Sequence, residues 1–224
     1  MPNGSCGASD VPGALGETNN PEWKTVAIDE PSEALVAPLG SVGFRWGESG
    51  KWNLEEKDGA GHARRLRLSL AGTGAAVAAV DFPYFGGRAV APFVSTAHGE
   101  ILTRNVPVRS IAGTNGETIT VATVYDLMMA NYGLDRGLGG GNVARGYEDD
   151  APFTPAWAAR VTGVKGDAIV AVARAFAANA EATNGRSMII IGAGMNHWYH
   201  MDMNYRGVIN LLAFCGCVGQ SGGG

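Results

Sequence analysis

Apolar residues recur at helical spacing in the second half of the chain. Between residues 167 and 180 they follow the i, i+3, i+4, i+7 rule of an amphipathic helix, with Asp167 in the capping region. A second helix is predicted over residues 204–215, for which Asp202 or Asn204 can serve as the cap. The apolar positions of the first helix are Ile169, Val172, Ala173, Phe176, Ala177 and Ala180.

Two further helices are indicated in the middle of the chain. Thr154 followed by Pro155 is typical of an N-cap and a first helical residue, and Gly163 is a natural stop. These three residues predict a short helix over residues 155–161. Helical spacing also extends over residues 124–134, just before a segment rich in glycine.

Strand patterns occur before the first of these helices. Residues 66–70 alternate leucine with polar residues, as in a half-buried strand, and residues 117–125 are rich in Thr, Val and Ile. Residues 113–116 lie between Ile111 and Ile119 and have the composition of a tight turn. The sequence therefore predicts a β-hairpin at this place.

A short apolar run at residues 188–191 has the composition of a strand that is covered on both faces. Gly192 and Gly194 follow the run and let the backbone turn sharply. Polar side chains come next, at the carboxyl end of the predicted strand, where open α/β sheets bind their ligands. They are Asn196, His197, Trp198, Tyr199, His200 and Asp202.

These elements predict an α/β fold with two parts. Residues 1–150 are expected to be an irregular region, rich in loops and strands, that belongs to a larger domain, and residues 1–50 are expected to be surface loops. Residues 151–224 are expected to form a layered α/β segment. Because the chain ends in the loop GQSGGG where an α/β site leads into further structure, we expect it to be a piece of a longer protein.

Charge and composition exclude several classes of function. The formal net charge of −4 over 224 residues provides no basic field, which disfavours nucleic-acid binding. The N-terminus lacks the features of a signal peptide, and every apolar run is shorter than the roughly 20 residues of a membrane span. The three cysteines, Cys6, Cys215 and Cys217, do not make a disulfide framework, and the last two are expected to be packing residues.

Two glycine-rich segments flank the helix predicted over residues 204–215. The first, residues 192–194, resembles the start of the dinucleotide fingerprint, but His197 stands where the third glycine belongs, which disfavours an ordinary NAD site. The second, residues 216–224, has many open backbone N–H groups that can cradle phosphates, although such a segment is more often only a turn. We expect both to lie on one side of the sheet and to form a single pocket.

The candidate side chains also have structural interpretations. His197 and His200 are either ligand contacts or, respectively, a core histidine and a surface histidine, and Arg206 pairs either with a phosphate or with a carboxylate. The remaining candidates are expected to be structural: Trp198 and Tyr199 in the core, Asp202 as a helix cap, and His62 and His98 in solvent.

Several segments resemble one protein family in the same order along the chain. Residues 185–224, GRSMIIIGAGMNHWYHMDMNYRGVINLLAFCGCVGQSGGG, are similar to the catalytic alpha subunits of bacterial respiratory nitrate reductases, within the molybdopterin oxidoreductase (dimethyl sulfoxide reductase) superfamily. The texts NHWYHMDMNYRG and FRWGESGKWNLE point to nitrate reductase within that group. The other matching segments are residues 40–55, 82–87, 124–138 and 153–164.

The resemblance implies reduction of nitrate to nitrite by oxygen-atom transfer at a molybdenum bis(molybdopterin guanine dinucleotide) centre. It implies that Gly194, Asn196 and His197 contact the pterin or pyrophosphate part of the cofactor. The residues implied to wrap its phosphate or nucleotide part are Gly219, Gln220, Ser221 and Gly222.

The family's molybdenum-binding aspartate and the ligands of its four-iron four-sulfur cluster lie upstream of the matched region. We therefore expect neither catalytic nor metal-binding residues in this chain, and no activity from the chain alone. The resemblance also implies an iron-sulfur beta subunit, a membrane-bound quinol-oxidising gamma subunit, and a peripheral position at the cytoplasmic face of the cell membrane.

Two other functions remain open at this point. One is another molybdopterin oxidoreductase, such as a formate dehydrogenase, because the helix, the glycine turn and the terminal glycine-rich loop are similar to many members of the superfamily. The other is a non-catalytic nucleotide-binding module on the same fold.

Overall fold

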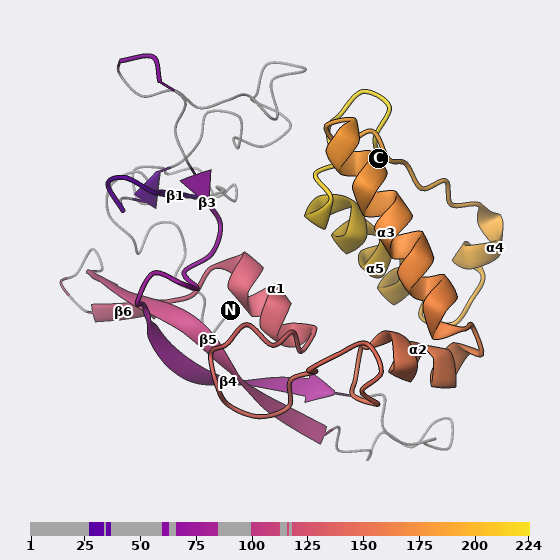
Figure 1. The fold of residues 1–224 in the computed structure, drawn as a ribbon, viewed down its shortest axis with the longest axis horizontal. Helices are drawn as coiled ribbons and strands as arrows, with labels where there is room; N and C mark the ends of the chain where they lie inside the picture. Colours follow the sequence, from indigo (N-terminus) through magenta and orange to yellow (C-terminus); the bar gives the residue numbers. More distant parts are fainter. Residues whose placement is uncertain are drawn as a thin grey trace.

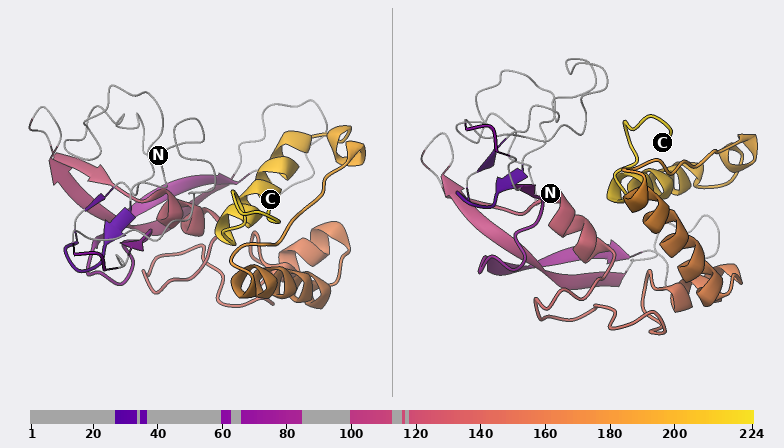
Figure 2. Two further views of the ribbon diagram at one scale, coloured as in Figure 1. Left: turned by 90° about the horizontal axis from the view of Figure 1, so that it is seen from above. Right: turned by 45° about the horizontal axis from the view of Figure 1, so that its top comes forward.

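The structure is a computed structural model that describes residues 27–33, 35–36, 60–62, 66–84, 100–112, 116 and 118–224. Its strands and first helix lie on one side, and the four later helices lie on the other (Figure 1). Two further views show the same separation (Figure 2). The strands are β1 Ala27–Asp29, β2 Leu35–Val36, β3 Leu66–Arg67, β4 Ala76–Tyr84, β5 Glu100–Ala112 and β6 Thr118–Val121. The helices are α1 Val124–Asn131, α2 Pro155–Thr162, α3 Gly166–Ala182, α4 Ala193–Asn196 and α5 Met201–Phe214.

The described strands form two antiparallel sheets. One has the order β2-β1-β3 and the other the order β4-β5-β6. In the second sheet Ile111 pairs with Ile119, so the predicted hairpin is confirmed, although residues 113–115 and 117 of its turn lie outside the described residues. The strand predicted over residues 66–70 ends at Arg67, because the next residues leave the sheet to contact α1.

α1 packs against β5 and is held there by buried polar groups. Asp126, in its first turn, is fully buried and accepts hydrogen bonds from Ser69 Oγ at 2.6 Å and from the backbone N–H of Leu70 at 2.8 Å. Its carboxylate also accepts from Thr123 Oγ1 at 2.8 Å and from Arg136 Nη1 at 2.6 Å. A buried charge is tolerated when it is paired and hydrogen-bonded in this way.

A buried arginine satisfies the opposite end of α1. The Arg104 side chain donates from Nη1 to the carbonyl oxygen of Asn131, the last residue of the helix, at 2.9 Å. It also donates from Nε to the carbonyl oxygen of Asn142 at 2.6 Å. A cation is favourable at a helix C-terminus, where backbone carbonyls lack partners. Burial lowers the pKa of the Arg104 guanidinium from its ordinary value.

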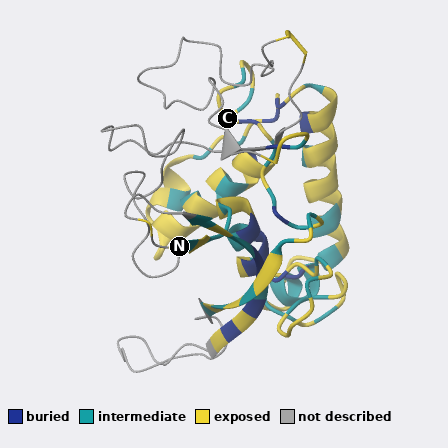
Figure 3. Cartoon of the chain, turned by 90° about the vertical axis from the view of Figure 1, so that its left-hand side faces the viewer, coloured by how far each residue is buried: buried dark blue, intermediate teal, exposed yellow. Residues whose placement is uncertain are grey.

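The predictions for α2 and α3 are confirmed by local geometry. Thr154 caps α2 by accepting from the backbone N–H of Trp157, Pro155 is its first residue, and Gly163 ends it in the left-handed region. α3 covers the predicted range, with Asp167 in its first turn. Most of its surface is exposed, as the yellow regions of Figure 3 illustrate, and Ala180 is its buried residue.

The prediction for the start of α5 is wrong by three residues. The helix begins at Met201, and the residue before it, His200, lies in the left-handed region with φ of 57° and makes no side-chain capping hydrogen bond. Asp202 and Asn204 therefore do not cap the helix, although Asp202 lies in its first turn, where a negative charge is favourable. A positive φ is uncommon for a residue with a side chain and marks local strain.

The strand predicted at residues 188–191 is also wrong. These residues carry no strand assignment, and Ile190 is 88% exposed. Near this segment the backbone pairs with a single residue, Gly224. The Ile189 N–H donates to the Gly224 carbonyl, and the Gly224 N–H donates to the Ser187 carbonyl. A strand requires a neighbour along its whole length, and the described residues provide a neighbour at this single position.

Aromatic side chains connect the two sides of the molecule. Phe214 of α5 meets Tyr125 of α1 and Tyr132, the C-cap of α1, edge to face, with ring centroids 6.2 and 6.0 Å away. The hydroxyl of Tyr132 accepts a hydrogen bond from Asn210 Nδ2 of α5 at 3.0 Å. On the far side of Tyr132, Phe153 extends the cluster towards α2. α1 therefore joins the sheet to the helices.

The fold prediction is confirmed in its coarse form, since the described residues mix helices with small antiparallel sheets. The layered arrangement with a sheet under α5 does not occur among the described residues. Most of residues 1–50 lie outside the described part, so the prediction of surface loops stays a prediction.

Candidate functional site

The turn that follows residues 188–191 is open to solvent. Gly192 precedes the short helix α4, which contains Gly194 and ends at Asn196, with His197 as its C-cap. A β-carbon added at Gly192 or at Gly194 would meet no atom of the described residues within 4 Å. Asn196 and His197 are both exposed. The turn therefore presents backbone, an amide and an imidazole to whatever lies next to it.

Tyr205 orients the amide of Asn196. The Tyr205 hydroxyl, one turn into α5, donates a hydrogen bond to Asn196 Oδ1. An amide whose oxygen is occupied in this way has its two Nδ2 hydrogens left for a second partner. Asn196 is thereby prepared to donate to an acceptor such as a carbonyl or phosphate oxygen. Sequence reasoning missed Tyr205, because the left-handed residue between α4 and α5 sets this contact and leaves no spacing signal.

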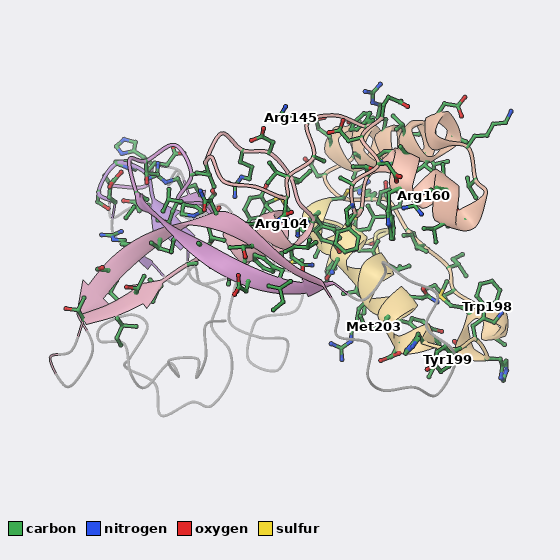
Figure 4. All side chains as sticks on the ribbon, turned by 90° about the horizontal axis from the view of Figure 1, so that it is seen from below. Arg104, Arg145, Arg160, Trp198, Tyr199 and Met203 are labelled. Atoms are coloured by element: carbon green, nitrogen blue, oxygen red, sulfur yellow. The ribbon has the colours of Figure 1, made fainter. Side chains whose placement is uncertain are left out.

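The aromatic residues between α4 and α5 were expected in the core, and this expectation is wrong. Trp198 is 68% exposed and Tyr199 is 88% exposed. Figure 4 shows both at the outer end of the helical side, away from the sheet. Met203, on the first turn of α5, is also exposed. Three large side chains at the start of α5 and just before it are therefore exposed.

The loop after α5 holds the second group of predicted residues. Gly219 and Gly222 lie in the left-handed region, with φ of 81° and 85°, and Ser221 is exposed. No described atom accepts a hydrogen bond from the backbone N–H groups of residues 218–222. Consecutive backbone N–H groups that point the same way can form concavities that bind anions, and these free donors make the loop a candidate for such a contact.

Part of the glycine content has a structural reason. A β-carbon at Gly223 would lie 2.2 Å from the carbonyl oxygen of Gly185 and 2.5 Å from that of Cys217. A β-carbon at Gly185 would lie 2.2 Å from the carbonyl oxygen of Gly216. These backbones approach too closely for any side chain, so the loop is closed onto the end of α3 by glycine packing.

The two glycine-rich segments do not form the single pocket that was expected. The first precedes α5 and the second follows it, so they lie at opposite ends of a 14-residue helix, roughly 20 Å apart by helical rise. Figure 1 shows α4 and the C-terminus at these two ends. The expectation failed because a helix that connects two turns also separates them by its own length.

The two cysteines near the C-terminus pack as predicted. Cys217 is fully buried in a cluster with Ala180 and Leu212, and Cys215 packs against this cluster. Burial raises the pKa of the Cys215 thiol, and the neighbouring Cys217 raises it further. Cys215 is therefore a poor nucleophile at neutral pH.

The remaining candidates are His200, Arg206, His62 and His98. His200 is exposed beside the turn, and its ring contacts that of Tyr199 at 3.9 Å. Arg206 is exposed and makes no ion pair with another described residue. His62 is exposed as expected, and His98 lies outside the described residues.

No group of three or more His, Cys, Asp or Glu side chains among the described residues is placed to hold a metal ion. No helix in the same part of the chain has the length and apolar character needed to cross a bilayer.

Comparison with known proteins places this chain in one family. Residues 39–224 match the molybdopterin oxidoreductase family. The chain is 56% identical to the respiratory nitrate reductase 1 alpha chain of Escherichia coli and 57% identical to the respiratory nitrate reductase 2 alpha chain, over 97% of its length in both cases. It is 41% identical to the nitrate reductase alpha chain of Bacillus subtilis over 93% of its length. The chain spans about 17% of the length of the two Escherichia coli relatives and 16% of the Bacillus relative. The resemblance seen in the sequence is confirmed, and the chain belongs to the molybdopterin oxidoreductase family.

Proposed function

We propose that the protein containing this chain reduces nitrate to nitrite and that this chain holds part of its molybdopterin cofactor. The observation that carries the proposal is the open turn from Gly192 to His197, which presents free backbone and side-chain donors in a chain of this family. The high identity to nitrate reductase alpha chains supports nitrate as the substrate.

The residues of the turn fit a polyanionic cofactor. Gly194 would let the backbone approach the ligand closely, and Asn196 Nδ2 and the His197 imidazole would donate to oxygen atoms of its pterin or pyrophosphate part. When bound, the cofactor would supply the molybdenum chemistry for oxygen-atom transfer from nitrate. The protein contributes binding, orientation and electrostatics.

Gly219, Gln220, Ser221 and Gly222 form a second contact with the same cofactor, at its phosphate or nucleotide part. The free N–H groups of this loop support anion binding, and the separation along α5 suits a ligand with long dinucleotide arms. The bis(guanine dinucleotide) form of the cofactor therefore agrees with two separate contacts better than a compact ligand does.

Tyr205 is a positioning residue in this proposal. It reaches the cofactor only through Asn196, whose oxygen it occupies. Loss of its hydroxyl frees the amide to rotate and to present its oxygen to the ligand, which is unfavourable beside a phosphate or carbonyl oxygen.

The wider arrangement follows the family. A four-iron four-sulfur cluster in another part of the protein, an iron-sulfur beta subunit and a membrane quinol-oxidising gamma subunit complete the electron path. The protein is attached peripherally at the cytoplasmic face of the cell membrane through these partners. Within the chain, we place the division between the strand-rich region and the cofactor-holding segment near residue 150.

The function is tested by expressing the full gene, measuring molybdenum content and assaying nitrate reduction with reduced viologen. We expect molybdenum in the purified protein and formation of nitrite. Formate oxidation without nitrite formation would favour a formate dehydrogenase. Protein without molybdenum and without either activity would favour a non-catalytic nucleotide-binding module.

The site assignment is tested with paired variants in the full-length protein. Asn196→Ala and Tyr205→Phe are expected to lower the amount of bound pterin, measured by the fluorescence of its oxidised form after release. Tyr132→Phe is the matched control, because it removes a second Tyr–Asn hydrogen bond, which the Tyr132 hydroxyl makes with Asn210 of α5. Equal loss of pterin in Tyr205→Phe and Tyr132→Phe would argue against a positioning role.

A further inference from the structure

A pocket with two arginines lies in the sheet region, away from the turn and the loop described above. Its cavity volume is about 320 Å³, within the range of about 300–1,000 Å³ that is usual for small-molecule sites. Its lining includes the charged residues Arg67, Arg109 and Glu33 and the apolar residues Leu70 and Val108. We call it the arginine pocket.

The charges in the arginine pocket do not balance. Glu33 Oε1 accepts from Arg67 Nη2 at 3.0 Å, whereas Arg109 Nη1 donates to the Glu33 backbone carbonyl at 2.8 Å. Arg109 has no carboxylate partner among the described residues. Two guanidinium groups therefore share one carboxylate, and the pocket has an excess of positive charge.

One donor of the pocket is left without an acceptor. Arg67 Nε is buried and makes no hydrogen bond to any described atom. A buried donor without a partner is destabilising, so such groups in folded proteins usually have a partner. Arg67 is a lining residue of the arginine pocket, and its Nε is a donor that the described residues leave unpaired.

We propose that the arginine pocket binds a small molecule with a phosphoryl group next to an apolar body. Guanidinium groups recognise phosphate through paired, charge-assisted hydrogen bonds. Donors from two separate strands suit the several oxygens of a phosphoryl group better than the two oxygens of a carboxylate. Leu70 and Val108 provide the surface for the apolar body. The site is independent of the proposed nitrate-reducing function.

The proposal is tested by titration calorimetry on the purified full-length protein at low chloride concentration. The probes are phenyl phosphate, inorganic phosphate and benzyl alcohol. Phenyl phosphate is expected to bind more tightly than inorganic phosphate, and benzyl alcohol is expected to give no measurable heat. Absence of binding by phenyl phosphate would overturn the proposal, as would equal binding of benzyl alcohol.

Substitutions locate the binding. Arg67→Gln and Arg109→Gln are each expected to weaken phenyl phosphate binding by about tenfold or more, as loss of a charge-assisted hydrogen bond predicts. Arg160→Gln is the control, because Arg160 forms an exposed ion pair with Asp150 outside the pocket. If Arg67→Gln fails to fold, Arg109→Gln still decides, since among the described residues the Arg109 side chain donates its hydrogen bond to the Glu33 backbone carbonyl and pairs with no carboxylate. Unchanged affinity in Arg109→Gln, or an equal loss in Arg160→Gln, overturns the assignment.

Discussion

The sheet region and the helical region of this chain place their side chains in opposite ways. Around α1, charged groups such as Asp126 and Arg104 are buried, and each is surrounded by hydrogen-bonding partners. Around α4 and α5, large apolar groups such as Ile190 and Tyr199 are exposed. The buried charges around α1 are thus satisfied by residues of the chain itself, whereas the helical region presents a surface suited to contacts outside the chain.

The largest expected effect concerns the buried carboxylate. Asp126→Ala leaves Arg136 and three other donors without their acceptor, and we expect a loss of about 3–5 kcal/mol in the free energy of unfolding. Asp150→Ala is the matched control, because its ion pair with Arg160 is exposed and contributes about 0–1 kcal/mol. Urea unfolding measures both. Similar losses for the two variants would show that burial does not distinguish the regions.

The exposed apolar surface is tested by a polar substitution. The chain spans about 17% of its Escherichia coli relatives, so in the full-length protein we expect other segments or the cofactor to cover Ile190. Ile190→Ser should then lower the free energy of unfolding by about 1.5–3 kcal/mol, the value for a buried aliphatic side chain. A change below about 0.5 kcal/mol is typical of a surface position and would mean that the side chain stays in solvent.

Glycine packing at the end of the helical region predicts a loss of stability comparable to that of Ile190→Ser or smaller. Gly223→Ala forces a β-carbon against two backbone carbonyls, and we expect destabilisation of about 1–3 kcal/mol by overpacking. Gly207→Ala, in the middle of α5 with open space around it, should cause no loss. Thermal unfolding of both variants decides. A tolerated alanine at residue 223 would contradict the close backbone approach.

The smallest expected effect is a pH dependence at Cys215. Because its folded pKa is raised by burial and by Cys217, its contribution to stability is fully present below the ordinary thiol pKa and is lost as pH rises through the raised value. Iodoacetamide should therefore label the native protein slowly at pH 8 compared with the unfolded protein. Equal labelling rates would show that the thiol is neither buried nor shifted.

Local signals predicted the helices of this chain well. Thr154, Pro155 and Gly163 define α2 because capping depends on neighbouring residues alone. The same reasoning failed at residues 188–191, where a strand depends on partners that composition does not reveal. It also failed for Trp198 and Tyr199, which are exposed. The apolar character of a side chain does not reveal whether residues of its own chain bury it.

The candidate site was predicted in its residue types and not in its geometry. The glycines, Asn196 and His197 are readable from the sequence, and so is the family resemblance, because both depend on the order of residues. The Tyr205 contact to Asn196 depends on the left-handed turn at His200, and the buried pairing of Asp126 with Arg136 depends on how α1 lies on the sheet. The two turns are separated by the length of α5, because a helix rises about 1.5 Å for every residue and α5 has 14 residues. Residue order alone thus determined the family and most helices, and tertiary structure decided which side chains meet, because contacts between distant residues follow from packing.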